Sequence, residues 1–154
     1  MLTPGSVADH LYFIEKGVIR SYVKEEERQI TTWITEENEI IGPTRTIGTN
    51  NLCQEYLQAL EDTDLVALPV DFTEFIFNTY PETNVVGRRI WEYYYRKAEE
   101  RAHICRITSA EKKYKHLMET RPELINRISL KYIASYLGMT LETLSRVRSR
   151  KNKP

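Results

Sequence analysis

The sequence predicts an α+β fold in which an N-terminal β domain is followed by helices. Between Leu11 and Val70, short runs of β-branched and aromatic residues alternate with charged or glycine-containing turns, which is typical of short strands. After Pro81 no proline occurs until Pro122, and apolar residues recur at spacings of three and four, which is typical of amphipathic helices. The 154 residues therefore suit two small domains joined by a shared element.

Within the predicted β domain, Gly17 marks the first turn. It lies between the runs that begin at Leu11 and Val18, where a tight reversal needs a positive φ angle that glycine adopts without steric cost. The elements expected next are a charged turn at 24–28, a strand at 30–35, and a hairpin whose strands 57–60 and 65–68 frame the polar turn 61–64. We therefore expect an all-β unit.

A long helix is expected in the middle of the chain. Asp71 is a candidate cap for a short helix that Pro81 ends or restarts, and beyond it Gly87 alone interrupts a long helix-favouring segment. The apolar seam of this segment needs a partner, and we favour the same helix of a second copy over the β domain of the same chain. The predicted dimer seam consists of Val86, Ile90, Tyr93, Tyr94, Arg101 and Ile104.

The strongest local pattern is a helix-turn-helix near the C-terminus. A preceding helix starts after the cap residue Ser109 and ends at 121–122. Ser129 is then expected to cap a first helix, Gly138 to form a turn in a left-handed conformation, and Thr140 to cap a second helix. The residues expected to face inward are Leu130, Ile133, Ala134, Leu137, Leu141, Leu144 and Val147.

The outward face of the second helix carries groups that suit the edges of DNA bases in the major groove. Arg146 can donate two hydrogen bonds to guanine, and Glu142 can accept one from cytosine or orient Arg146. Ser145 lies on the same face. The residues assigned to phosphates and to positioning are Ser129, Thr140, Thr143, Arg148, Ser149, Arg150 and Lys151. The alternative is an amphipathic helix pair with a solvated basic tail.

Charge is strongly polarised along the chain. Residues 1–80 carry 5 basic and 14 acidic side chains, residues 81–120 carry 9 and 6, and residues 121–154 carry 8 and 2. A basic end on an acidic body can place positive charge against a polyanion.

Other functional classes find little support in the sequence. Cys53 and Cys105 are far apart and the three histidines form no ligand pattern, so we expect no metal or iron-sulfur site. We find no nucleophile-base pattern or phosphate loop, and we therefore expect no enzyme. No apolar run approaches the roughly 20 residues of a membrane span, and the N-terminus lacks the features of a secretory signal, so we expect a cytoplasmic protein with no membrane partner.

These residues resemble the family of the cyclic-AMP receptor protein and the fumarate-nitrate regulators, the Crp/Fnr family of bacterial transcription regulators. The segment from Leu11 to Arg20 is similar to the family's β-roll hairpin, and residues 59–65 are similar to its late hairpin. The segment from Glu142 to Arg146 matches the family's recognition pattern of glutamate, two spacers, serine and arginine.

The resemblance implies three parts. They are an N-terminal β-roll of the cyclic-nucleotide-binding jelly-roll type at 1–70, a hinge and dimerisation helix at 71–107, and a winged helix-turn-helix at 108–154. It also implies a homodimer that regulates transcription by binding a two-fold-symmetric site on double-stranded DNA, with RNA polymerase as a further partner.

The sequence departs from this family pattern in the β-roll. Members that bind cyclic nucleotides have a Gly-Glu pair for the ribose and an Arg-Ser or Arg-Thr pair for the phosphate. Here Gly42 is followed by Pro43, and Cys53 and Gln54 stand in place of the second pair. We therefore do not expect cyclic AMP as the effector, and the sequence identifies no other. The first helix and strand of the family β-roll have no counterpart before Leu11, and the wing after Arg150 is short.

The competing function is a small-ligand-binding β-roll module whose helical end mediates protein interaction. Mobility-shift measurements with DNA distinguish it from a DNA-binding regulator.

Overall fold

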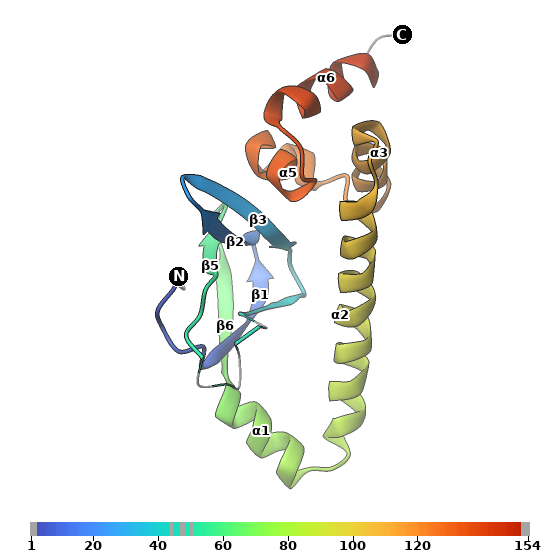
Figure 1. Cartoon of the computed structure of the whole chain (residues 1–154). Helices are drawn as coiled ribbons and strands as arrows, with labels where there is room; N and C mark the ends of the chain where they lie inside the picture. Colours follow the sequence, from blue (N-terminus) through green and yellow to red (C-terminus); the bar gives the residue numbers. More distant parts are fainter. Residues whose placement is uncertain (1–2, 44, 47–48, 50, 152–154) are drawn as a thin grey trace. The chain divides into compact units, whose positions relative to one another are not determined.

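The computed structural model describes residues 3–43, 45, 46, 49 and 51–151, and it combines two antiparallel sheets with helices (Figure 1). It divides into two compact units, residues 1–91 and 92–154. The strands are β1 His10–Lys16, β2 Ile19–Glu25, β3 Arg28–Thr35, β4 Ile40–Ile41, β5 Tyr56–Ala59 and β6 Asp64–Pro69. The helices are α1 Val70–Thr79, α2 Thr83–Arg106, α3 Ala110–Thr120, α4 Leu124–Arg127, α5 Leu130–Tyr136 and α6 Leu141–Lys151. The expected α+β fold, with strands followed by helices, is therefore confirmed.

The six strands form two three-stranded sheets. In one sheet β1 lies between β4 and β6, and in the other β2 lies between β3 and β5. Strands from both sheets contribute to one apolar cluster, in which Ile14, Ile19, Ile41 and Leu57 are buried. Burial of such side chains stabilises the β domain by roughly 1.5–3 kcal/mol each.

Gly17 has the positive φ angle expected from the sequence, but the predicted reversal into a hairpin is wrong. Its φ is 101°, and a Cβ atom on it would lie 2.8 Å from the carbonyl oxygen of Asp62. Because β1 and β2 belong to different sheets, the chain passes at Gly17 from one sheet to the other. The true hairpin joins β2 to β3, and its turn holds Glu26 at a φ of 54°.

The hairpin predicted at 57–68 is wrong for the same reason. β5 pairs with β2, whereas β6 pairs with β1, so the polar segment 61–64 connects the two sheets. Alternation of apolar and polar residues predicts which side chains point inward, but it does not identify the neighbouring strand.

The first helices begin differently from the sequence prediction. Pro69, and not Asp71, occupies the N-cap position of α1, and no side chain caps this helix.

Gly87 does not interrupt α2. It lies inside the helix, where a Cβ atom would approach the Phe77 ring to 3.0 Å, so glycine lets α1 and α2 come close together.

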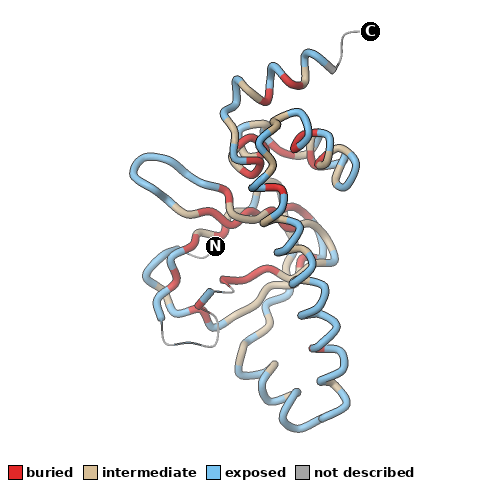
Figure 2. Tube along the Cα trace, turned by 45° about the vertical axis from the view of Figure 1, so that its right-hand side comes forward, coloured by how far each residue is buried: buried red, intermediate tan, exposed pale blue. Residues whose placement is uncertain are grey.

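The second unit has its own apolar core beneath the C-terminal helices. Ser109 caps α3 as predicted, since its hydroxyl accepts a hydrogen bond from the Lys112 amide at 3.3 Å. The buried apolar residues of this unit are Ile104, Tyr114, Leu117, Leu124, Ile128, Ile133, Ala134, Tyr136, Leu137, Leu144 and Val147. In the first unit, by contrast, Figure 2 shows buried residues along β2 but none on α1.

Across the described ranges, no helix is both long enough and apolar enough to cross a membrane.

Candidate nucleic-acid interface

A tight turn centred on Gly138 joins α5 to α6. Gly138 has a φ of 64° and donates its amide to the Ser135 carbonyl at 3.1 Å, while the Met139 amide reaches the Ala134 carbonyl at 3.0 Å. These two bonds complete a Schellman motif, in which a left-handed residue ends a helix. The left-handed conformation predicted for Gly138 is therefore confirmed.

Capping side chains were predicted at the start of both helices, and one of the two is present. The Thr140 hydroxyl accepts a hydrogen bond from the Thr143 amide at 3.2 Å, which fixes the first turn of α6. Ser129 occupies the N-cap position of α5, but its hydroxyl makes no cap bond, so the predicted side-chain cap is wrong.

The inward faces of α5 and α6 agree with the sequence prediction except near the helix starts. Ile133, Ala134, Leu144 and Val147 are buried between the helices. Leu141, the first residue of α6, is 43% exposed, so the inward position predicted for it is wrong.

A buried lysine, which the sequence pattern did not reveal, supports the turn from α3. The ammonium group of Lys113 donates a hydrogen bond to the Leu137 carbonyl at 2.9 Å, next to the turn glycine. A cation at this end of α5 also complements the negative end of the helix dipole. Lys113 lies four residues before buried Leu117, and this spacing was the available sign that it faces inward.

The outward face of α6 presents the three residues assigned to base edges. Glu142, Ser145 and Arg146 are all exposed. The backbone amide of Glu142 and, to a lesser extent, the Thr140 hydroxyl hold the pKa of the Glu142 carboxyl below its usual value. The carboxylate is thus an ionised acceptor at the start of its own helix.

The residues assigned to phosphates spread over more than one face. Ser129, Thr140, Ser149 and Arg150 are exposed, and Thr143 and Arg148 are half-buried. The Ser149 hydroxyl donates to the Ser145 carbonyl at 2.9 Å. The side chain of Lys151 and the wing expected after it lie outside the described residues.

An open cleft separates the first turn of α3 from α6. Its volume is about 320 Å³. Within it, Glu111 of α3 accepts a hydrogen bond from Arg150, with 3.1 Å between Oε1 and Nη1. Sequence reasoning missed Glu111, because its partner lies 39 residues away and no local spacing indicates the contact. The lining residues are Ser109, Ala110, Glu111, Thr143, Arg146, Val147 and Arg150.

The residues assigned to the dimer seam fall in both compact units. Val86 and Ile90 in the first unit and Tyr93 in the second are exposed. Tyr94 is half-buried and meets the Tyr93 ring edge-on, with 5.2 Å between centroids.

The last two seam residues contact helices of their own unit. Ile104 is buried within the second unit. The Arg101 guanidinium lies 4.0 Å from the centre of the Tyr136 ring on α5, which is a cation–π geometry.

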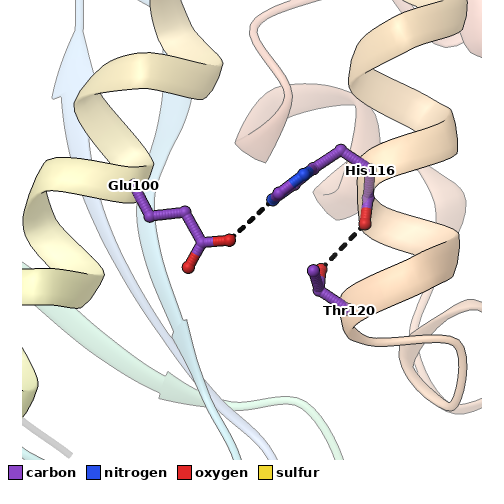
Figure 3. Close-up of polar contacts among 3 residues, drawn as sticks. All are labelled: Glu100, His116 and Thr120. Carbon is purple, nitrogen blue, oxygen red and sulfur yellow. Dashed lines mark hydrogen bonds and ion pairs between the residues drawn. The ribbon is translucent and has the colours of Figure 1, made fainter.

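A polar contact also connects α2 to α3 (Figure 3). The His116 ring nitrogen Nε2 lies 2.7 Å from a carboxylate oxygen of Glu100. On the same helix, the Thr120 hydroxyl donates to the His116 carbonyl at 2.9 Å. Together with Arg101 and Tyr136, this pair connects the C-terminal part of α2 to the helices that support α6.

The β domain holds the other residues that the sequence singled out. Cys53 is buried and its thiol donates to the Glu55 carbonyl oxygen at 3.2 Å, whereas Gln54 is exposed. Burial raises the pKa of the Glu55 carboxyl. Cys53 and Gln54 therefore lie next to a buried carboxyl group, on which the charge of Arg45 acts in the opposite direction to burial.

Comparisons with known proteins agree on the fold. The family model described as the cyclic nucleotide-binding domain matches residues 2–80. No curated protein sequence matches the chain.

Several solved structures share the fold along nearly the whole chain. The c-di-GMP-responsive global regulator CLP of Xanthomonas campestris has a TM-score of 0.74 at 16% identity, over 98% of this chain and 81% of its own. FixK2 of Bradyrhizobium japonicum has a TM-score of 0.73 at 22% identity, over 92% and 74%. A transcriptional regulator of the CRP/FNR family from Thermus thermophilus has a TM-score of 0.68 at 17% identity, over 99% and 82%.

Proposed function

Because the chain belongs to the cyclic nucleotide-binding domain family and has the fold of Crp/Fnr transcription regulators, we propose that it is a sequence-specific DNA-binding regulator that acts as a homodimer. The observation that carries this proposal is the exposed face of α6. Its opposite face is buried on α5, so a short helix presents Glu142, Ser145 and Arg146 to a major groove that is wide enough to admit it.

Each of these three side chains has a separate role. Arg146 donates two hydrogen bonds to the major-groove edge of guanine, and Ser145 adds a hydroxyl beside it. Glu142 accepts from a cytosine amino group, which suits a carboxylate that stays ionised. Thr140, Ser149 and Arg150 contact phosphates and set the position of the helix, with no preference among sequences.

Exposed apolar residues on α2 support the homodimer. Val86, Ile90 and Tyr93 follow one another at spacings of four and three, so they share one face of the helix, and pairing with a second copy would remove that face from water. Two-fold symmetry then places the two α6 helices about 34 Å apart, in successive major grooves of one operator. The exposed residues are Val85, Val86, Ile90, Trp91, Tyr93 and Tyr95.

We do not assign a cyclic nucleotide to the β domain, because the residues at the expected positions do not fit its phosphate. The Cys53 thiol is buried and already bonded, and the nearby Glu55 carboxyl is buried as well. A carboxylate repels a phosphate, whereas an arginine would bind one in two places. Calorimetric titration with cyclic AMP is therefore expected to show no binding.

We also propose a non-enzymatic role in the cytoplasm, with RNA polymerase as a partner at the promoter. The regulators that share the fold support the non-enzymatic role, whereas RNA polymerase and the cytoplasm rest on the resemblance of the sequence to the Crp/Fnr family.

The test of DNA binding starts from a random DNA pool. Selection with the purified chain is expected to yield a two-fold-symmetric motif. Arg146→Ala should then lose about 1–3 kcal/mol of binding free energy and relax the preference at one base pair of each half-site. Arg106→Ala, which removes an exposed arginine at the end of α2, is the matched control and should bind as the wild type does.

Two results would contradict the proposal. One is the absence of any symmetric motif under all conditions tested. The other is a mobility shift for Arg146→Ala that equals the shift of Arg106→Ala.

A further inference from the structure

Glu111 is an acidic residue beside the surface that we assign to DNA. It lies in the first turn of α3, and its carboxylate oxygen is 3.1 Å from the Arg150 guanidinium in the last turns of α6. The side chains are 62% and 69% exposed, so water and salt reach both partners. Both also line the cleft that holds Arg146, the residue assigned to guanine.

We propose that Glu111 competes with DNA phosphate for Arg150 and thereby restrains the affinity of the protein for DNA. This inference rests on the function proposed above and concerns the regulation of the same surface. A phosphate oxygen and a carboxylate oxygen both bind a guanidinium in the same way, so Arg150 engages one at the expense of the other.

The geometry explains why this competition weakens DNA binding without preventing it. An ion pair between exposed side chains is weak and is screened by salt, so a phosphate can displace Glu111. The displaced carboxylate nevertheless stays in the cleft beside Arg146 and repels the phosphates that approach α6. Glu111 therefore opposes the basic residues that attract DNA to this end of the chain.

The expected consequence is largest for the electrostatic part of binding. Affinity for DNA of any sequence depends on how many phosphates the protein neutralises. Each neutralised phosphate makes the plot of log affinity against log salt concentration steeper by about 0.9. Without the Glu111 carboxylate, the positive charge of Arg150 acts on the phosphate undiminished, so each protomer can gain up to one such increment of slope. The base preference that Arg146 provides should stay the same, because this effect concerns phosphates only.

The experiment uses the full chain and the operator selected above. Glu111→Gln removes the charge, keeps the size of the side chain and leaves the Ser109 cap of α3 in place. Its dissociation constants for the operator and for scrambled DNA are measured from about 50 to about 200 mM salt. The matched control is Glu119→Gln on the same helix, whose 61% exposed carboxylate pairs with Lys115 at 3.6 Å and does not line the cleft.

Glu111→Gln is expected to bind both DNAs about 3- to 10-fold more tightly at the lowest salt and to show a steeper salt dependence. Glu119→Gln is expected to stay within about 2-fold of the wild type. In an Arg150→Gln background, Glu111→Gln should bring a smaller gain than in the wild type, because only the repulsion between the Glu111 carboxylate and the DNA phosphates remains to be removed. Thermal unfolding of each variant checks that it is folded at the temperature of the binding measurements.

Three outcomes would overturn the inference. Equal effects of Glu111→Gln and Glu119→Gln would show a general charge effect. An undiminished gain in the Arg150→Gln background would show that Arg150 is not the contested group. If the wild type binds its operator and Glu111→Gln binds it with unchanged affinity, the inference about Glu111 is wrong and the proposed function stands. If the wild type binds no DNA, the proposed function is wrong as well.

Discussion

Replacing Gly138 by alanine should destabilise the protein by about 1 kcal/mol. A residue with a side chain pays roughly 1–2 kcal/mol for the left-handed conformation that Gly138 adopts at a φ of 64°. The new Cβ atom would lie 3.6 Å from the Lys113 ammonium, which is an ordinary contact and adds no clash. Alanine also lowers the conformational entropy of the unfolded chain, which offsets about 0.4–1 kcal/mol of this loss of stability.

Thermal unfolding followed by circular dichroism measures this effect. For a chain of this size, about 1 kcal/mol corresponds to a decrease in Tm of roughly 2–4 °C. Gly17→Ala is the contrasting variant, because a clash with the Asp62 carbonyl adds to the backbone strain and should lower Tm much further. Gly5→Ala has a positive φ of 92° in open space and should resemble Gly138→Ala.

Either of two results would refute this reasoning. An unchanged or higher Tm for Gly138→Ala would mean that the turn does not require a left-handed residue. A loss as large as that of Gly17→Ala would mean that Lys113 cannot accommodate the added carbon. Operator affinity at low temperature should change less than about 2-fold, since no contact residue is altered.

Three further predictions concern side chains that hold the helices and sheets. Lys113→Met should cost about 1–3 kcal/mol in urea unfolding, because the Leu137 carbonyl loses its donor, and Lys113→Arg should retain part of the stability. Glu100→Ala and His116→Ala should show a coupling of about 0.3–1 kcal/mol in a double-mutant cycle, and additive effects would contradict the contact. Burial raises the pKa of folded Glu55 above its ordinary value of 4.5, so its ionisation costs stability as pH rises through the folded pKa. Glu55→Gln should therefore have a higher Tm than the wild type at neutral pH, and this advantage should disappear as pH falls below the ordinary value.

The sequence predicted the helix boundaries well where local hydrogen bonds determine them. Ser109 and Thr140 accept bonds from amides three residues later, and Gly138 provides the conformation that a Schellman motif needs. All partners in these motifs lie within a few residues, so the sequence alone contains the necessary information.

The strand pairing could not be predicted in this way. The segments around Gly17 and 61–64 have the composition of hairpin turns, yet each connects two different sheets. Local patterns specify turns and inward faces, whereas the choice of neighbouring strand depends on how both sheets share one core.

The outward face of α6 followed from its helical period, but the residues that surround it did not. Glu111 and Lys113 act on partners 39 and 24 residues away, across a contact between helices. An isolated helical wheel places both on α3 without indicating what they meet. Only the packing of α3 against α5 and α6 shows their roles.

The polar groups at the start of α6 that hold the pKa of Glu142 low have a consequence for operator sequences. A base that offers Glu142 no donor leaves the carboxylate stabilised by its own helix, so such a substitution costs little. A base pair without guanine opposite Arg146 removes two charge-assisted hydrogen bonds at once. Natural operators should therefore tolerate more variation at the position facing Glu142 than at the position facing Arg146.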